Sequence, residues 1–149
     1  MSMSHQAFFK DQSKIQEQLV EAWFIRDFIL HATRQGRVPL IGHSDIDLFG
    51  FDLILGLEGR EELLLVQMKT YGGANSIWDV HKDLLRRGGQ VVVVKLDLDA
   101  APDSIKYHAL TPEGRGSALG KSPKKPHPDK CGVQKGDLKP VDDLMDLFA

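Results

Sequence analysis

Three polar side chains, Asp52, Gln67 and Lys69, have types and spacings that could form a reactive site. Side chains alternate along a strand, so Gln67 and Lys69 share one face and Met68 points to the other. If the strand that carries Asp52 pairs with this one as a hairpin, the carboxylate can lie beside the amide and the amine. Polar groups that converge at the ends of apolar strands are costly unless they hydrogen-bond or bind a metal ion. The trio therefore predicts a polar site.

The chemistry that suits this trio is hydrolysis of a phosphodiester. A carboxylate and an amide oxygen are hard ligands appropriate to Mg²⁺ or Mn²⁺. A metal ion held there acidifies a bound water and neutralises charge on the phosphate. A lysine beside it can orient or help to deprotonate the attacking water and stabilise the same charge. The expected roles are Asp52 as principal ligand, Gln67 as neutral ligand and Lys69 as the water-activating group.

These residues also carry a resemblance to a known family. Gly50-Phe51-Asp52, a gap of fourteen residues and then Gln67-Met68-Lys69 resemble the PD-(D/E)xK nuclease signature, in the variant where Gln replaces the second acidic residue. That superfamily includes restriction endonucleases, Holliday-junction resolvases and some homing endonucleases. The resemblance covers roughly residues 12–100. Two departures from the pattern are that Gln67 carries no charge and that no proline precedes Asp52.

The resemblance implies a restriction-endonuclease-like core, with a central mixed β-sheet flanked by helices, and an Mg²⁺-dependent DNA endonuclease. It also implies a further acidic ligand from the first helix, for which Glu17 is our choice; Glu21, one turn away, is the alternative. DNA is the expected partner, and no small-molecule cofactor is expected. Such domains commonly act as homodimers when both strands are cut, and the apolar ends of the chain could supply an interface.

Other candidate residues have ordinary explanations beside functional ones. A basic helix surface follows His81 and consists of Lys82, Arg86 and Arg87. This surface either contacts DNA phosphates or is simply solvated. Asp45 and Asp47 lie in an acidic loop that is more often solvated than ligating. His127 and Cys131 are only two ligands where a structural zinc site needs four, so we reject zinc.

The elements that would position the site follow from hydrophobic periodicity. We predict a long helix over about residues 12–35, apolar nearly all round and so buried on more than one side. Strands are expected within Asp45–Leu55 and Leu63–Lys69, joined by a short connection at Leu57–Glu61. A second helix over Ile77–Arg87, a strand at Val91–Leu96 and a last short strand at Ile105–Leu110 complete an α/β domain with a mixed sheet.

The chain divides by composition into a nuclease-like core, residues 1–110, and a Pro/Gly/Lys-rich extension, residues 111–149. We expect Pro112–Pro140 to be extended or partly flexible. The segment Lys121–Lys139 contains six lysines and two aspartates, which is a local charge surplus of +4. This surplus is equally compatible with a DNA-binding arm and with a soluble linker. Val141–Phe148 has the pattern of a short amphipathic helix that docks onto the domain or onto a partner.

Composition sets only broad bounds. A chain of 149 residues can form one domain with a hydrophobic core. The net charge of -2 argues against a generally basic DNA-coating protein, but not against a local DNA-binding face. No apolar stretch is long enough to cross a bilayer, residues 1–10 show no secretory pattern, and a single cysteine is compatible with a reducing cytoplasm.

Two further functions remain open from the sequence. One is a catalytically inactive nuclease-fold protein that binds nucleic acid or a protein partner, which the Gln substitution and the acidic net charge favour. The other is an unrelated α/β interaction domain, in which Asp52, Gln67 and Lys69 do not converge. The choice between DNA and RNA, the specificity of cleavage and the setting (restriction, defence, recombination, repair or homing) are also open.

Overall fold

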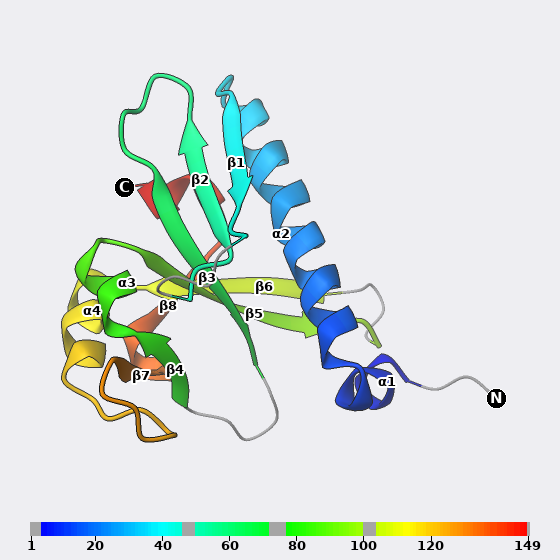
Figure 1. The fold of residues 1–149 in the computed structure, drawn as a ribbon. Helices are drawn as coiled ribbons and strands as arrows, with labels where there is room; N and C mark the ends of the chain where they lie inside the picture. Colours follow the sequence, from blue (N-terminus) through cyan, green and yellow to red (C-terminus); the bar gives the residue numbers. More distant parts are fainter. Residues whose placement is uncertain (1–3, 46–49, 72–76, 100–103, 149) are drawn as a thin grey trace.

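The computed structural model describes residues 4–45, 50–71, 77–99 and 104–148 of the chain. The α-helices in these ranges are α1 (His5–Asp11), α2 (Ser13–Arg34), α3 (Lys82–Arg86) and α4 (Pro112–Leu119). The strands are β1 (Pro39–His43), β2 (Leu53–Leu57), β3 (Leu64–Thr70), β4 (Ile77–His81), β5 (Gln90–Asp97), β6 (Ser104–Leu110), β7 (Lys130–Gln134) and β8 (Leu138–Val141). Two 3₁₀ helices follow late in the chain, η1 (Lys135–Asp137) and η2 (Leu144–Phe148). Figure 1 shows α2 lying along one side of the larger sheet.

The fold is mixed α/β. Six strands form the central sheet in the order β1-β2-β3-β5-β6-β8, and β4 pairs with β7 in a separate two-stranded sheet. Within the six-stranded sheet only β3 and β5 run parallel, and the other neighbouring strands are antiparallel. The predicted mixed sheet is therefore confirmed, with a mostly antiparallel character.

The β2–β3 hairpin and the parallel partner β5 occupy the middle of the sheet. β2 and β3 pair antiparallel with Leu53 opposite Val66, as the short connection after Leu57 predicts. On the other side of β3, Lys69 lies opposite Val93 of β5. All four residues of Val91–Val94 are buried, as expected for a central strand covered on both faces.

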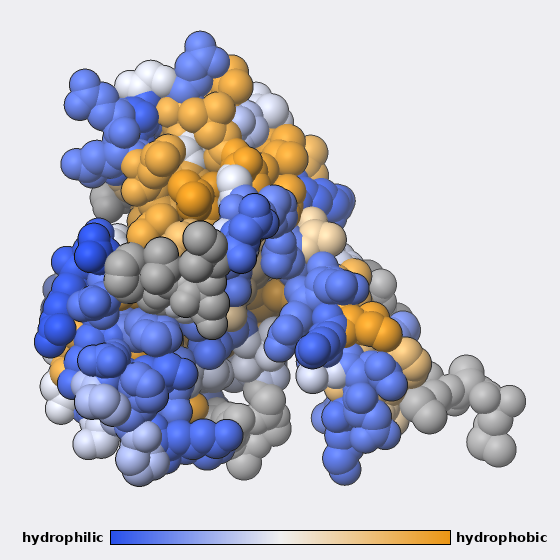
Figure 2. All heavy atoms as spheres, viewed as in Figure 1, coloured by the Kyte–Doolittle hydropathy of each residue, from blue (hydrophilic) through white to orange (hydrophobic). Residues whose placement is uncertain are grey.

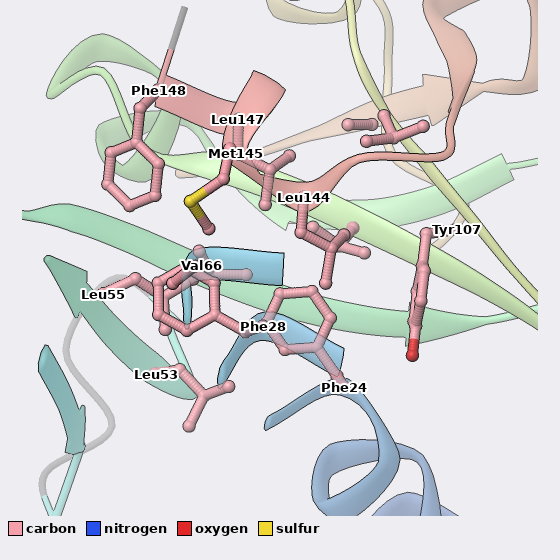
Figure 3. Close-up of a cluster of buried hydrophobic side chains, with 14 of the residues drawn as sticks. Phe24, Phe28, Leu53, Leu55, Val66, Tyr107, Leu144, Met145, Leu147 and Phe148 are labelled. Carbon is pink, nitrogen blue, oxygen red and sulfur yellow. The ribbon is translucent and has the colours of Figure 1, made fainter. Parts of the chain in front are cut away.

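Alternate residues of β5 point into two different hydrophobic cores. Val92 and Val94 belong to a core beneath α2 and η2, which contains Phe24, Phe28 and Leu144. Figure 3 shows Phe24, Phe28 and Leu144 of this core gathered between α2, the sheet and the end of the chain. Val91 and Val93 belong to a second core formed with α3, α4 and the two-stranded sheet; its other members are Trp78, Val80, Leu84, Leu85, Leu110, Ala118, Cys131 and Val133. The sheet is thus covered by helices on both faces.

Helix α2 matches the predicted bounds but buries one stripe rather than several. Val20, Phe24, Phe28 and Ala32 are its buried residues, spaced four apart along one face. Ile29 is 38% exposed, so the expectation of burial on more than one side is wrong. The remaining apolar residues of the helix are covered only in part, because the sheet meets it from one direction.

The predicted helix over Ile77–Arg87 is wrong in its first half. Residues Ile77–His81 form strand β4, and only Lys82–Arg86 is helical. The physical reason is alternation: Trp78 and Val80 are buried in the second core, while Ile77, Asp79 and His81 are half-buried on the other face of the strand. A helix would place Trp78 and Val80 on different sides.

The expectation that residues Pro112–Pro140 are extended or partly flexible is also wrong. Helix α4 begins there with Pro112 in its first turn, and the Thr111 hydroxyl accepts the Gly114 N–H at 2.8 Å as its cap. β7 pairs with β4, and β8 pairs with β6. The few apolar residues of this segment are enough to hold it against the domain, because almost every one of them lies in a hydrophobic core.

The end of the chain docks onto the domain, as its amphipathic pattern predicts. Leu144, Met145, Leu147 and Phe148 of η2 are buried. The Leu144 N–H donates to Nδ1 of His31 on α2 at 3.0 Å. The segment is a 3₁₀ helix rather than an α-helix. It closes the first core.

Surface character differs between the two parts of the molecule. Figure 2 shows apolar residues over β1 and β2 and hydrophilic residues over the part that holds α3, α4, β4 and β7. The helices in the described ranges lack the combination of length and apolar character that spanning a membrane requires.

Candidate functional site

Asp52, Gln67 and Lys69 line the same cavity, which has a volume of about 600 Å³. Its other lining residues are Glu21, His43, Ser44, Asp45, Gly50, Phe51, Asp79, His81 and Lys130. A smaller cavity of about 310 Å³ adjoins the same three side chains, together with Glu17, Glu21, Val20, Met68, Thr70 and Trp78. The prediction of an unrelated interaction domain, in which the trio does not converge, is therefore wrong on this point.

Asp52 lies just before β2 and is fixed against β3 by two hydrogen bonds. Its N–H donates to Val66 O at 2.8 Å, and its Oδ2 accepts the Met68 N–H at 2.7 Å. This second bond holds the carboxylate between Gln67 and Lys69 along the strand. Burial raises the pKa of Asp52; the Met68 N–H opposes this effect, and Glu21 adds to it.

Gln67 contributes a buried acceptor. Among the described residues, no hydrogen-bond donor reaches its Oε1, which is inaccessible to solvent. A buried oxygen without a partner costs about 1–3 kcal/mol. A water, a cation or a donor on a bound molecule in the adjoining cavity would satisfy it.

Lys69 is a partly desolvated amine among charges of both signs. Burial lowers its pKa, and the nearby Asp52, Asp79 and Glu17 raise it, whereas Lys130 lowers it further. A lysine in such surroundings releases its proton more readily than an exposed one.

Glu17, our choice for the helix acid, and the alternative Glu21 both line a cavity beside the trio, but not equally. Glu21 lines both cavities, whereas Glu17 is exposed and lines only the smaller one. Glu21 also affects the pKa of Asp52 more than Glu17 does, while Glu17 acts on Lys69. The Glu21 Oε1 lies 3.0 Å from Nδ1 of His43, which fixes its carboxylate at the cavity wall.

Gly50 brings the wall of the cavity close to Gln67. Its φ of +69° lies in the left-handed region that glycine adopts without strain. A Cβ at this position would come within 2.8 Å of His81 Cδ2 and 3.1 Å of Gln67 Nε2. The glycine of the Gly50-Phe51-Asp52 motif is thus required twice, for backbone conformation and for space.

Asp79, Lys130 and His43 also line the cavity but were not predicted from the sequence. Asp79 and Lys130 come from the separate two-stranded sheet, in which β4 and β7 pair. The alternation of apolar and polar residues in Ile77–His81 is the signal that could have placed Asp79 beside the site. Lys130 carries no comparable signal, since its position depends on a pairing across about fifty residues of chain.

The predicted basic residues separate in the structure. The Lys82 Nζ donates to Pro128 O at 3.2 Å, and Arg86 lies 3.7 Å from Asp83 on its own helix. Arg87 lines another cavity, where β3 and β5 begin. His81 lines the main cavity itself. The basic helix surface is therefore not continuous beside the site.

The remaining candidates fall in different places. Asp45 lines the main cavity, and Asp47 lies outside the described residues. His127 stacks edge-on against His81 with ring centres 6.3 Å apart. Cys131 is buried in β7, and burial raises the pKa of its thiol. In the described ranges, no group of three or more His, Cys, Asp or Glu residues is arranged to hold a metal ion.

Comparison with known proteins adds no assignment, because no family model, curated protein or solved structure matches the chain.

Proposed function

We propose that this chain is an Mg²⁺-dependent DNA endonuclease whose core is related to that of the restriction endonucleases. The observation that carries the proposal is the buried Gln67 Oε1, which has no hydrogen-bond partner among the described residues, in a cavity shared with the Asp52 carboxylate and the desolvated Lys69 amine. The order of elements also supports it. A helix carrying acids precedes a hairpin whose second strand carries Gln67 and Lys69, and a parallel strand follows.

The residues of the cavity fit a hard divalent cation. Asp52 would hold it through a carboxylate oxygen, Gln67 through Oε1 and Glu21 or Glu17 through a carboxylate from α2. This donor set is all oxygen and includes one amide, which suits Mg²⁺ with several waters retained. When bound, the ion would polarise the scissile phosphate and acidify a water.

The chain's own residues supply binding, orientation and proton transfer. The Met68 N–H keeps one oxygen of Asp52 in place. Lys69, with its pKa lowered by burial, accepts a proton from the attacking water in its neutral form and stabilises phosphate charge in its protonated form. Lys130 lines the same cavity and attracts the phosphate.

A second candidate function is a nuclease-fold protein that binds DNA without cutting it. Two observations favour it: a neutral amide occupies the position of the second acid, and the Glu21 carboxylate is already engaged by His43. This candidate predicts DNA binding that is independent of divalent metal. In this candidate the basic residues bind DNA as they do in the first, but Lys69 takes no part in proton transfer.

The test is cleavage of a labelled DNA duplex with Mg²⁺, together with calorimetric titration of Mn²⁺. Asp52→Asn should abolish Mn²⁺ binding, and Lys69→Ala should lower cleavage by about 10²–10⁴-fold while Mn²⁺ still binds. Gln67→Glu should tighten Mn²⁺ binding, because it adds a charge at a ligand position. Asp83→Asn, at an exposed acid on α3, is the matched control and should change neither measurement.

Each candidate has an outcome that contradicts it. Cleavage by Asp52→Asn at the wild-type rate would rule out the proposed site. Metal-independent DNA binding by a wild-type protein that neither cuts nor takes up Mn²⁺ would establish the second candidate instead.

A further inference from the structure

A lysine-rich loop, residues 122–129, connects α4 to β7 and lies next to the candidate site. We call it the lysine loop. It contains Lys124, Lys125 and His127, with prolines at 123, 126 and 128. In Figure 1 it is the yellow-to-orange connection beside β4 and β7. Because proline fixes φ, the three prolines limit the conformations of this loop before any contact is made.

Asp79 holds the lysine loop by its backbone. The carboxylate accepts the Lys124 N–H on Oδ1 at 2.5 Å and the Lys125 N–H on Oδ2 at 3.0 Å. Both oxygens are therefore used to orient two successive lysines. Because both bonds come from backbone N–H groups, they fix the course of the loop at these two residues.

The far end of the loop is held by α3. The Lys82 N–H donates to Asp129 O at 2.8 Å, and the Lys82 Nζ donates to Pro128 O at 3.2 Å. Within the loop, the Asp129 N–H donates to Nδ1 of His127 at 3.1 Å. The loop is thus fixed at both ends on the elements that flank the cavity.

The same residues join the loop to the cavity. Asp79 lines the cavity while it binds the loop, and Lys130, the first residue after the loop, lines it too. The His127 ring contacts the ring of His81, which is a further cavity residue. The lysine loop therefore lies directly beside the cavity.

The charge of the loop is opposite to that of the whole chain. Lys124 and Lys125 are both exposed, and Lys130 follows them, against one loop acid, Asp129. The chain as a whole has a net charge of -2. Figure 2 shows a hydrophilic surface over this part of the molecule. Fixed positive charges at the rim of a cavity attract a polyanion and raise its local concentration.

We propose that the lysine loop binds the phosphate backbone of double-stranded DNA on one side of the phosphodiester that enters the cavity, and that Asp79 is the positioning residue of this loop. The proposal rests on the proposed function for its choice of ligand. Of the six lysines in Lys121–Lys139, it assigns Lys124 and Lys125 to DNA contact rather than to a solvated linker.

The first experiment measures binding of a fluorescent DNA duplex by anisotropy, without divalent metal, over a series of salt concentrations. Lys124→Ala/Lys125→Ala should weaken binding about tenfold and reduce the slope of log affinity against log salt by about 2, one unit for each phosphate that the variant no longer neutralises. Lys95→Ala/Lys106→Ala is the matched control. It removes the same two charges from an exposed cross-strand pair on β5 and β6 and should leave binding and slope unchanged.

The second experiment measures whether removing the negative charge of Asp79 strengthens or weakens DNA binding. Asp79→Ala removes a negative charge from the DNA-facing rim, so electrostatics alone predicts tighter binding. If Asp79 positions the lysine loop, the loop loses both anchoring bonds and binding becomes weaker despite the more positive surface. Asp79→Asn, which keeps an acceptor for one lysine N–H, should bind with intermediate affinity. Circular dichroism of each variant checks that the fold is retained.

These measurements separate the loop from the catalytic proposal. A wild-type protein that binds DNA through the lysine loop but never cuts contradicts the proposed function and supports the loop assignment. A wild-type protein that cuts, with unchanged affinity and salt slope in Lys124→Ala/Lys125→Ala, overturns the loop assignment alone. Tighter binding by Asp79→Ala, or a preference of the loop for duplex RNA over duplex DNA, overturns it as well.

Discussion

Gly50 determines how closely the chain approaches Gln67 in the candidate site. Its positive φ alone would strain any other residue by about 1–2 kcal/mol. Its second constraint is steric, because a Cβ there would lie within 3.1 Å of the Gln67 amide and closer still to the His81 ring. Backbone strain acts on stability, whereas displacement of Gln67 acts on the site. The two effects can be measured separately.

We expect Gly50→Ala to lower both stability and cleavage. Stability should fall by about 1–2 kcal/mol in urea unfolding. Cleavage and Mn²⁺ affinity should each fall at least about tenfold, because Gln67 Oε1 is displaced by even a small shift. Gly59 is the matched control: its φ is +86°, and a Cβ there would have no neighbour within 4 Å among the residues that the structure describes. Equal loss of activity in Gly59→Ala would show that strain, not displacement, is responsible.

At the scale of elements, the sequence predicts best those segments whose own pattern is strong. α2, β3 and β5 have the expected positions because long apolar periodicity or a run of β-branched residues leaves one choice. The sequence does not predict β4, because five residues are too few to distinguish the two-residue repeat of a strand from the longer repeat of a helix. The strands after Thr111 were missed because their apolar residues are sparse and gain burial only from distant partners.

The same distinction applies to the candidate site. The positions of Asp52, Gln67 and Lys69 were predictable because a short hairpin brings them together through local sequence. The choice between Glu17 and Glu21 depends on how α2 lies across the sheet, which the helix pattern does not state. Asp79 and Lys130 depend on a strand pairing between segments far apart in the chain.

Helix α4 shows how closely the late segments pack. A Cβ on Gly114 would come into direct collision with the backbone of Asp137, the last residue of η1. The Asp137 carboxylate is buried and accepts hydrogen bonds from the Lys121 amine and the Gln134 N–H. The backbone of Asp137 therefore cannot move aside without breaking these hydrogen bonds.

We expect Gly114→Ala to destabilise the protein by about 3 kcal/mol through overpacking. Gly116→Ala, two residues on in the same helix, should instead stabilise by up to about 1 kcal/mol, since a Cβ there has open space and alanine favours a helix. Urea unfolding of the two variants gives the comparison. Similar changes in both would contradict the close contact between α4 and Asp137.

At the scale of the whole molecule, the central sheet joins two cores. Alternate residues of β5 enter opposite cores, so neither core can lose its packing without disturbing this strand. The candidate cavity lies where the elements of both cores meet: Asp52 precedes β2 of the first core, and Asp79 lies in β4 of the second. A site assembled in this way requires that the two cores fold as one unit.

Leu144→Ala tests this cooperativity. Leu144 is fully buried in the first core, and its truncation should cost about 2–5 kcal/mol. Trp78 lies in the second core, so in a Trp23→Phe background its fluorescence reports unfolding there. If the cores unfold together, the transition of Trp78 shifts by the same free energy as the transition in circular dichroism. Asp142→Ala, at an exposed neighbouring position, should shift neither of the two transitions by more than about 0.5 kcal/mol.

A Trp78 transition that does not move in Leu144→Ala would contradict this cooperativity. It would mean that the second core, with Asp79 and Lys130, folds independently of the strands that carry Asp52 and Lys69.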